Sequence, residues 1–179
     1  GPFGGAGDSR AALLAFMADR LSYLLEQRGF DVRSVRAVMH AGVEHISPLE
    51  ARQKLEGLSQ LTRSEALLAV AALLKRVKNI TRGVTAPADA AEASAQRAAL
   101  TEPAEVALAA DLDARAPGIS AAAARGDYRE AFAGIGALQP TVTKFFDDVL
   151  VMAEDPSLRA ARLGLVARLR DLILDIADI

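Results

Sequence analysis

The sequence contains no cysteine and no tryptophan, and only 4% of its 179 residues are aromatic. The absence of cysteine excludes a disulfide scaffold and thiolate zinc sites, and it is typical of proteins that work in a reducing compartment such as the cytoplasm. No apolar run approaches the roughly 20 residues that a membrane-spanning helix requires, and no secretory signal is visible. The sequence therefore predicts a cytoplasmic protein with an aliphatic core and no membrane partner.

The residues that are present favour helices. Hydrophobic residues make up 51% of the chain and charged residues 25%, so the chain can bury a core. Alanine dominates, β-branched residues are sparse, and good helix formers fill most windows. Because no strand-like alternation persists anywhere, the sequence predicts an all-α fold, a helical bundle of about seven to nine helices.

Composition divides the chain into four segments. Residues 1–10, GPFGGAGDSR, look like a tag or linker remnant, and the last residues stop inside a strong helical pattern, so we expect a piece of a longer protein. Residues 11–82 are expected to form an N-terminal helical half, and residues 102–179 the C-terminal half of the same domain. Residues 83–101 are small, polar and alanine-rich, which indicates a linker or a weak surface helix.

Start and stop signals place the helices of the N-terminal half. A first helix is expected from about Ser9 to Arg28, ended by Gly29, and a short second helix over Val32–Ala41. Ser47 and Thr62 are predicted to cap the next two helices, because each precedes a glutamate by three residues.

In the C-terminal half, a helix is expected from Pro103 to about Arg115, where Pro117 should break or bend it before the helix resumes. Residues 128–138 and 140–153 read as two further helices. Asp155, followed by proline, is the expected start of the last helix.

One arginine, Arg162, interrupts the apolar stripe of that last helix. It is either a functional residue or a structural one that snorkels or forms a salt bridge with Asp147 or Asp148. Those two aspartates are adjacent and point about 100° apart on a helix, so they make a poor acid/base pair.

The histidines offer little for metal binding. His40 and His45 are spaced five apart across a glycine, and the chain has no other histidine or cysteine to complete a ligand set. No phosphate-binding glycine loop and no Ser–His–Asp arrangement is visible. We therefore expect this segment to catalyse nothing by itself, and a metal protein built around the two histidines stays open as an alternative that metal analysis would decide.

The stretch LLKRVKNITR concentrates positive charge. On a helix Lys75, Lys78, Asn79 and Arg82 share one face. Residues 63–82 contain five cations and one acid, a local +4 in a chain of net charge −2. Cations at a helix C-terminus can simply complement the macrodipole. They can equally form a surface for a phosphate backbone, which responds to the local potential and not to the net charge.

Several motifs resemble one family. The segment FFDDVLVMAEDPSLRAARL and the helical sequence that follows it are similar to the C-terminal end of bacterial glycyl-tRNA synthetase beta subunits, which carries a DALR-type anticodon-binding domain. FMADRLSYLLEQRGFDVRSVRAVM and LLKRVKNITR are similar to earlier parts of that domain. The resemblance runs from about Phe16 to Ile179 and is weakest over residues 83–101. Arginyl-type synthetases share the RxxRL motif at Arg159, so an arginyl-type domain remains an alternative.

The resemblance implies a function. The parent enzyme would ligate glycine to its tRNA with ATP and Mg²⁺, neither of which this segment is expected to hold, and it would work with a separate alpha subunit. This domain would bind the anticodon stem-loop of glycine tRNA. Phe145 or Phe146 could stack a base, although core packing is favoured. The candidate tRNA-binding residues are Lys75, Lys78 and Arg82 for phosphates, Asn79 or Arg76 for a base edge, and Arg159 and Arg162 as further candidates. A purely structural module for subunit association is the other alternative, in which charge reversal at Lys75 and Lys78 would leave tRNA binding intact.

Overall fold

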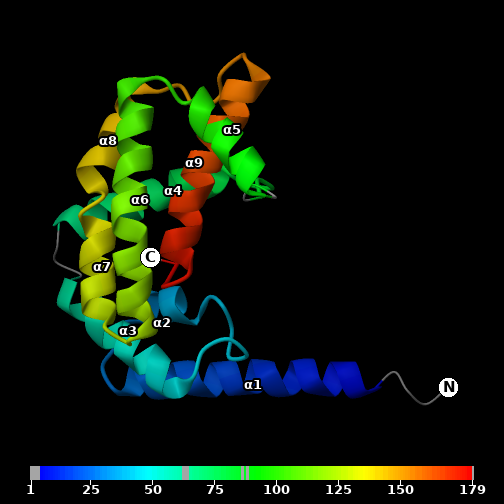
Figure 1. The fold of residues 1–179 in the computed structure, drawn as a ribbon. Coiled ribbons are helices and arrows are strands. Elements are labelled where there is room, and N and C mark those ends of the chain that lie inside the picture. The colour runs from blue at the N-terminus through cyan, green and yellow to red at the C-terminus, as the bar shows by residue number, and fades with distance from the viewer. Residues whose placement is uncertain (1–4, 62–64, 86, 88, 179) are drawn as a thin grey trace.

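The computed structural model describes residues 5–61, 65–85, 87 and 89–178, and these residues form nine α-helices and no strand (Figure 1). The all-α prediction is therefore confirmed. The helices are α1 Gly5–Gln27, α2 Val32–Met39, α3 Pro48–Leu61, α4 Glu65–Ile80, α5 Ala90–Ala99, α6 Pro103–Ala124, α7 Tyr128–Gly136, α8 Gln139–Asp148 and α9 Pro156–Leu174.

The helices pack around one aliphatic core. Helix α7 lies between α3 and α6, α8 lies against α6, and α4 contacts α7, α8 and α9. Helix α5 covers α9, and α1 packs on α2 and extends away from the bundle (Figure 1). The largest fully buried side chains include Leu108 and Leu112 of α6, Phe132 of α7, Phe145 of α8 and Leu169 of α9.

Caps set several of the helix ends where the sequence predicts them. Gly29 follows α1 with φ +94°, a left-handed conformation that favours glycine. The Ser47 hydroxyl accepts a hydrogen bond from the Glu50 N–H at 3.1 Å, and Asp155 accepts from two N–H groups in the first turn of α9. Thr62 lies outside the described residues.

Two segments that the sequence marked as irregular contribute to helices. Residues 5–10 form the first turns of α1, so this helix begins earlier than the expected Ser9. Within the alanine-rich residues 83–101, Asp89 accepts a hydrogen bond from Glu92 N–H and caps α5. Helix α5 packs on α9. The division of the chain into two halves stays a prediction.

Pro117 does not break α6. The helix continues through it to Ala124, which corrects the expected break. Proline removes one backbone hydrogen bond and costs about 3 kcal/mol in a helix interior. Its ring faces solvent, while Leu112 before it and Ile119 after it are 1% and 3% exposed. Burial of the side chains on both sides of the proline, Leu112 and Ile119, outweighs its local cost.

Helix α8 ends at Asp148, five residues before the expected end at Ala153. Val149 adopts an extended conformation, with φ −115° and ψ 124°. Burial then alternates along the segment, because Val149 and Val151 are 6% and 4% exposed and Leu150 is 72% exposed. This period of two suits an extended chain, which lets the two valines reach the core while the leucine between them points outward.

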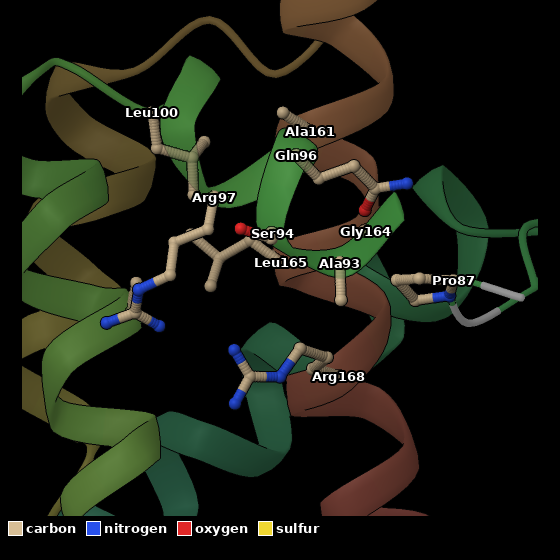
Figure 2. Close-up of a pocket in the computed structure, with 11 residues that line it drawn as sticks. Pro87, Ala93, Ser94, Gln96, Arg97, Leu100, Ala161, Gly164, Leu165 and Arg168 are labelled. Carbon is tan, nitrogen blue, oxygen red and sulfur yellow. The ribbon is translucent and has the colours of Figure 1, made fainter. Parts of the chain in front are cut away.

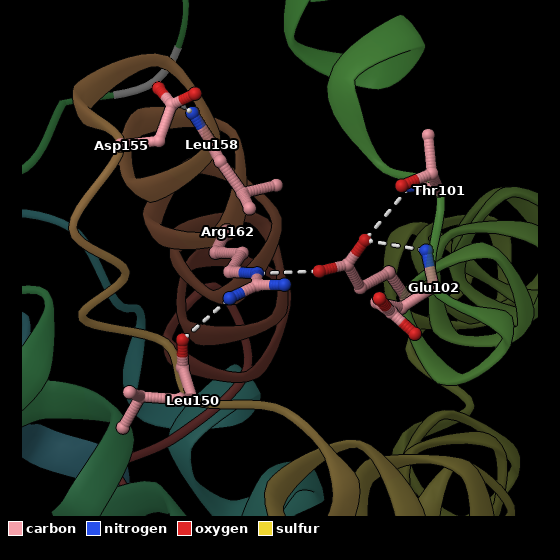
Figure 3. A network of polar contacts seen from close by, with 7 residues as sticks. Thr101, Glu102, Leu150, Asp155, Leu158 and Arg162 are labelled. Atoms are coloured by element: carbon pink, nitrogen blue, oxygen red, sulfur yellow. Dashed lines mark hydrogen bonds and ion pairs between the residues drawn. The ribbon is translucent and has the colours of Figure 1, made fainter.

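A buried ion pair links α6 to α9 (Figure 3). Arg162 Nε donates to Glu105 Oε1 at 2.5 Å, and Arg162 Nη1 donates to the Leu150 carbonyl at 2.8 Å. The second oxygen of Glu105 accepts the backbone N–H groups of Thr101 and Glu102 at 2.9 and 3.0 Å. The expected partner of Arg162, Asp147 or Asp148, is wrong, because the partner lies 57 residues away on α6.

We expect Glu105→Ala to lower the free energy of unfolding by about 3–5 kcal/mol, because it leaves the Arg162 guanidinium buried without a counter-charge. Urea denaturation measures this loss. Glu130→Ala, which removes an exposed ion pair with Arg125, serves as the matched control and should cost less than about 1 kcal/mol. Equal losses in the two variants would contradict a special role for the buried pair.

Candidate nucleic-acid interface

The basic end of α4 forms a small pocket. Lys75, Lys78 and Asn79 line it together with Leu74 and Asp178, and its volume is about 240 Å³. The structure thus brings together three of the four residues that the helical spacing places on one face. Arg82 lies two residues beyond the end of α4 and is exposed.

The chain's C-terminal segment completes this pocket. Asp178 forms an ion pair with Lys78, with 2.5 Å between the carboxylate oxygen and Nζ, and its backbone N–H donates to the Ala37 carbonyl of α2 at 2.8 Å. The carboxylate therefore offsets one of the positive charges. Lys75 is exposed and has no carboxylate partner among the residues that the structure describes.

Arg76 belongs to a different face of α4. Its guanidinium carbon lies 4.6 Å from the ring centroid of Phe146 on α8, a cation–π contact. Phe146 is 7% exposed and packs edge to face on the fully buried Phe145, with 5.4 Å between the ring centroids. Both rings belong to the core, the alternative that the sequence favoured over base stacking.

The two candidates of α9 differ in accessibility. Arg159 is half-buried in the first turns of the helix. Arg162 is 8% exposed, and its hydrogen bonds to Glu105 and to Leu150 use its guanidinium inside the protein. We therefore leave Arg162 out of the surface that is proposed below.

Arg170 closes the C-terminal end of α4, a role that the sequence analysis missed. Its two terminal nitrogens donate to the carbonyls of Thr81 and Val84 at 2.8 and 3.2 Å, and its Nε pairs with Asp171 at 2.7 Å. Thr81 and Val84 follow Ile80, the last residue of α4, so the guanidinium stabilises the carbonyls of the turn after the helix through charge-assisted hydrogen bonds. A contact across 89 residues leaves no signal in local spacing.

A second basic site lies between α5 and α9 (Figure 2). It is a pocket of about 540 Å³ with Arg97 and Arg168 on its wall. Both arginines form ion pairs with Asp113 of α6, Arg168 at 2.7 Å. Partial burial acts to raise the pKa of Asp113, but the hydrogen bonds from Arg168 and Arg97 outweigh it and hold the pKa below its usual value. Two guanidinium groups and one carboxylate leave one net positive charge here.

The histidines line a third pocket without forming a metal centre. His40 and His45 border it together with Glu50, Asp171 and Asp175. Among the residues that the structure describes, no three His, Cys, Asp or Glu side chains are close enough to hold a metal ion. No helix within the described ranges combines the length and the apolar character that crossing a bilayer requires.

Comparison with known proteins decides what kind of domain this is. A family model described as "DALR anticodon binding domain" matches residues 70–179. The chain belongs to this family. All the predicted site residues, from Lys75 to Arg162, lie within the matched part of the DALR domain, so the resemblance that the sequence motifs carried is confirmed.

The relatives are longer than this chain. It is 40% identical over 172 residues to the glycine–tRNA ligase beta subunit of Dechloromonas aromatica, which covers 96% of this chain and 23% of the relative. The corresponding subunit of Anaeromyxobacter dehalogenans is 39% identical over 166 residues, with 93% of this chain and 23% of the relative covered. The chain therefore spans about a quarter of the length of the relatives that it matches.

We expect Arg170→Ala to loosen the basic end of α4. Loss of two hydrogen bonds to partly buried carbonyls should lower the free energy of unfolding by about 1–3 kcal/mol. It should also speed amide hydrogen exchange at residues 77–84 more than elsewhere, which mass spectrometry of that peptide measures. Arg168→Ala, which removes an exposed arginine two residues away on the same helix, is the control. A uniform increase in exchange over the whole domain would contradict a local role for Arg170.

Proposed function

We propose that this DALR domain binds the anticodon stem-loop of glycine tRNA as part of a glycyl-tRNA synthetase beta subunit. The parent enzyme would ligate glycine to that tRNA with ATP in the cytoplasm, together with an alpha subunit. The names of the relatives support glycine over the arginyl alternative. The observation that carries the proposal is the grouping of Lys75, Lys78 and Asn79 around one pocket, with Arg82 just beyond.

We assign the contacts with the phosphate backbone of the tRNA to the cations of this surface. Lys75 and Arg82 are exposed and have no carboxylate partner within the described ranges, so their charge is available to phosphates. Lys78 is shared with Asp178, and this carboxylate would have to be displaced before Lys78 binds a phosphate directly. Lys75 and Arg82 therefore supply most of the attraction, and Lys78 supplies less.

We assign the contact with the edge of an anticodon base to Asn79. Glycine codons begin with two guanines, so the last two anticodon bases of glycine tRNA are cytosines. An amide can donate to the O2 or N3 atom of an unstacked cytosine and accept from its N4 amino group. Asn79 is exposed beside Lys75 and Lys78, whereas the Arg76 guanidinium lies over Phe146. Asn79 is thus better placed than Arg76 for a base.

The triple variant Lys75→Ala, Lys78→Ala, Arg82→Ala should bind glycine tRNA more weakly than the parent chain at low salt. Each phosphate contact in single-stranded RNA adds about 0.7 to the slope of log K against log salt, so the loss of Lys75 and Arg82 should lower the slope by about 1.4 and the loss of Lys78 should add less. Titrations at several salt concentrations measure this slope.

The matched control for that experiment is Arg52→Ala, Arg125→Ala, Arg129→Ala, which removes the same charge from exposed arginines on α3 and around the start of α7. We expect the control to retain most of the parent slope. If the two triple variants behave alike, the effect is net charge and α4 is not the RNA surface. If neither weakens binding, the proposal is wrong.

Asn79→Ala should reduce discrimination and leave the salt slope unchanged. One lost hydrogen-bonding amide corresponds to about 1–1.5 kcal/mol, roughly a tenfold change in the ratio of affinities. This ratio compares glycine tRNA with a tRNA in which both anticodon cytosines are replaced. Gln60→Ala, which removes an exposed amide on α3, should leave the ratio unchanged. If the Asn79 variant keeps the full ratio of affinities, Asn79 does not make the contact with the base.

A further inference from the structure

Helix α1 stands apart from the bundle. It runs over Gly5–Gln27, packs on α2, and extends well beyond the other helices at its N-terminal end (Figure 1). Its inner face is short, since Leu25 is 2% exposed and Leu21 is partly buried against the core. An isolated helix gains little from propensity alone and needs packing of an apolar face for stability.

A second apolar face of α1 is open to solvent. At 100° per residue, its members fall within an arc about 120° wide that borders the inner face of Leu21 and Leu25. All are about half exposed or more: Leu13 57%, Phe16 65%, Met17 50%, Tyr23 52% and Leu24 47%. A helix that is apolar on two faces is usually buried on both.

The chemistry of this outer face points to protein, not RNA. Arg20 is the one cation within the arc, and its guanidinium lies 5.8 Å from the centroid of the Tyr23 ring. A phosphate backbone needs several cations, whereas protein interfaces are enriched in aromatic residues, methionine and arginine. Contiguous exposed apolar patches of this kind mark interaction sites.

We propose that the outer face of α1 docks on another part of the same beta-subunit polypeptide. The matched segment is only 23% of the Dechloromonas aromatica subunit, so about three quarters of such a polypeptide lies outside it and can supply a covalently linked apolar surface. An intramolecular partner is present at high effective concentration, which lets a face of five side chains remain covered without a large interface. This docking rests on the proposed place of the chain in a beta subunit, but it does not depend on the RNA surface of α4.

Hydrogen exchange tests the docking in a chimeric subunit. The chimera is the beta subunit of Dechloromonas aromatica in which the matched segment is replaced by this chain. Amides of residues 9–27 should exchange at least about tenfold more slowly in the chimera than in the isolated chain, because burial of the outer face suppresses local opening. Phe16→Glu with Met17→Glu should abolish this protection. The matched control, Ala11→Glu with Ala15→Glu, adds the same charge on the exposed third side of the helix and should retain it.

Amides of α9 serve as the internal standard and should be equally protected in the isolated chain and in the chimera. If they are not, the protection of α1 is compared with that of α9 within each protein. Three results would overturn the proposal: equal exchange of α1 in both proteins, protection that appears only when the alpha subunit is added, or self-association of the isolated chain that Phe16→Glu abolishes in sedimentation.

Glycine tRNA binding by the isolated Phe16→Glu, Met17→Glu variant should match the parent, so failure of the docking and failure of RNA binding are distinguished.

Discussion

The buried pair of Glu105 and Arg162 fixes three parts of the chain at once. Glu105 closes the N-terminus of α6 through the N–H groups of Thr101 and Glu102, and Arg162 holds the extended segment after α8 through the Leu150 carbonyl. A carboxylate that is 0% exposed and a guanidinium that is 8% exposed tolerate burial only because each has its counter-charge and further hydrogen bonds. This pair therefore determines where α9 lies relative to α6.

The position of α9 in turn determines the shape of the basic surface. Arg170, two turns along from Arg162, holds the carbonyls at the end of α4, and Asp178 beyond α9 pairs with Lys78. The Asp178 N–H also fastens the same segment to α2. The residues proposed to contact RNA thus sit on α4, but their placement depends on groups about 90 residues further along the chain. A rigid support of this kind reduces the conformational entropy that these side chains lose when they bind a ligand.

Local signals in the sequence predicted local structure well. Glycine at position 29 and the side-chain oxygens of Ser47 and Asp155 act within one helical turn, so a short window contains the whole interaction. The grouping of Lys75, Lys78 and Asn79 also follows from helical spacing alone. The failures are tertiary. Pro117 is tolerated because distant packing pays its local cost.

Other features of the site could not be predicted from short windows. The carboxylate partner of Arg162 is 57 residues away, although several carboxylates lie nearer in the sequence. Arg170 pairs with the adjacent Asp171, but the Thr81 carbonyl to which it also donates is 89 residues away. The early end of α8 also depends on residues far away in the sequence. Val149 and Val151 are buried because they pack on the core, and an extended chain is needed for both to reach it. Sequence spacing identifies which residues share a face, but it does not identify which residues from other helices neutralise that face.

The distribution of carboxylates explains how a chain of net charge −2 can present a surface for phosphate. Asp113 sits between Arg97 and Arg168, and Asp111 pairs with Arg115, so acids accompany these three arginines of α5, α6 and α9. At the basic end of α4, Asp178 accompanies Lys78, whereas Lys75 and Arg82 have no carboxylate partner within the described ranges. Because exposed charges are screened beyond about 8–10 Å, an incoming phosphate responds to this local imbalance. The outer face of α1 lies on a separate helix, so the surface proposed for RNA and the surface proposed for docking differ in chemistry.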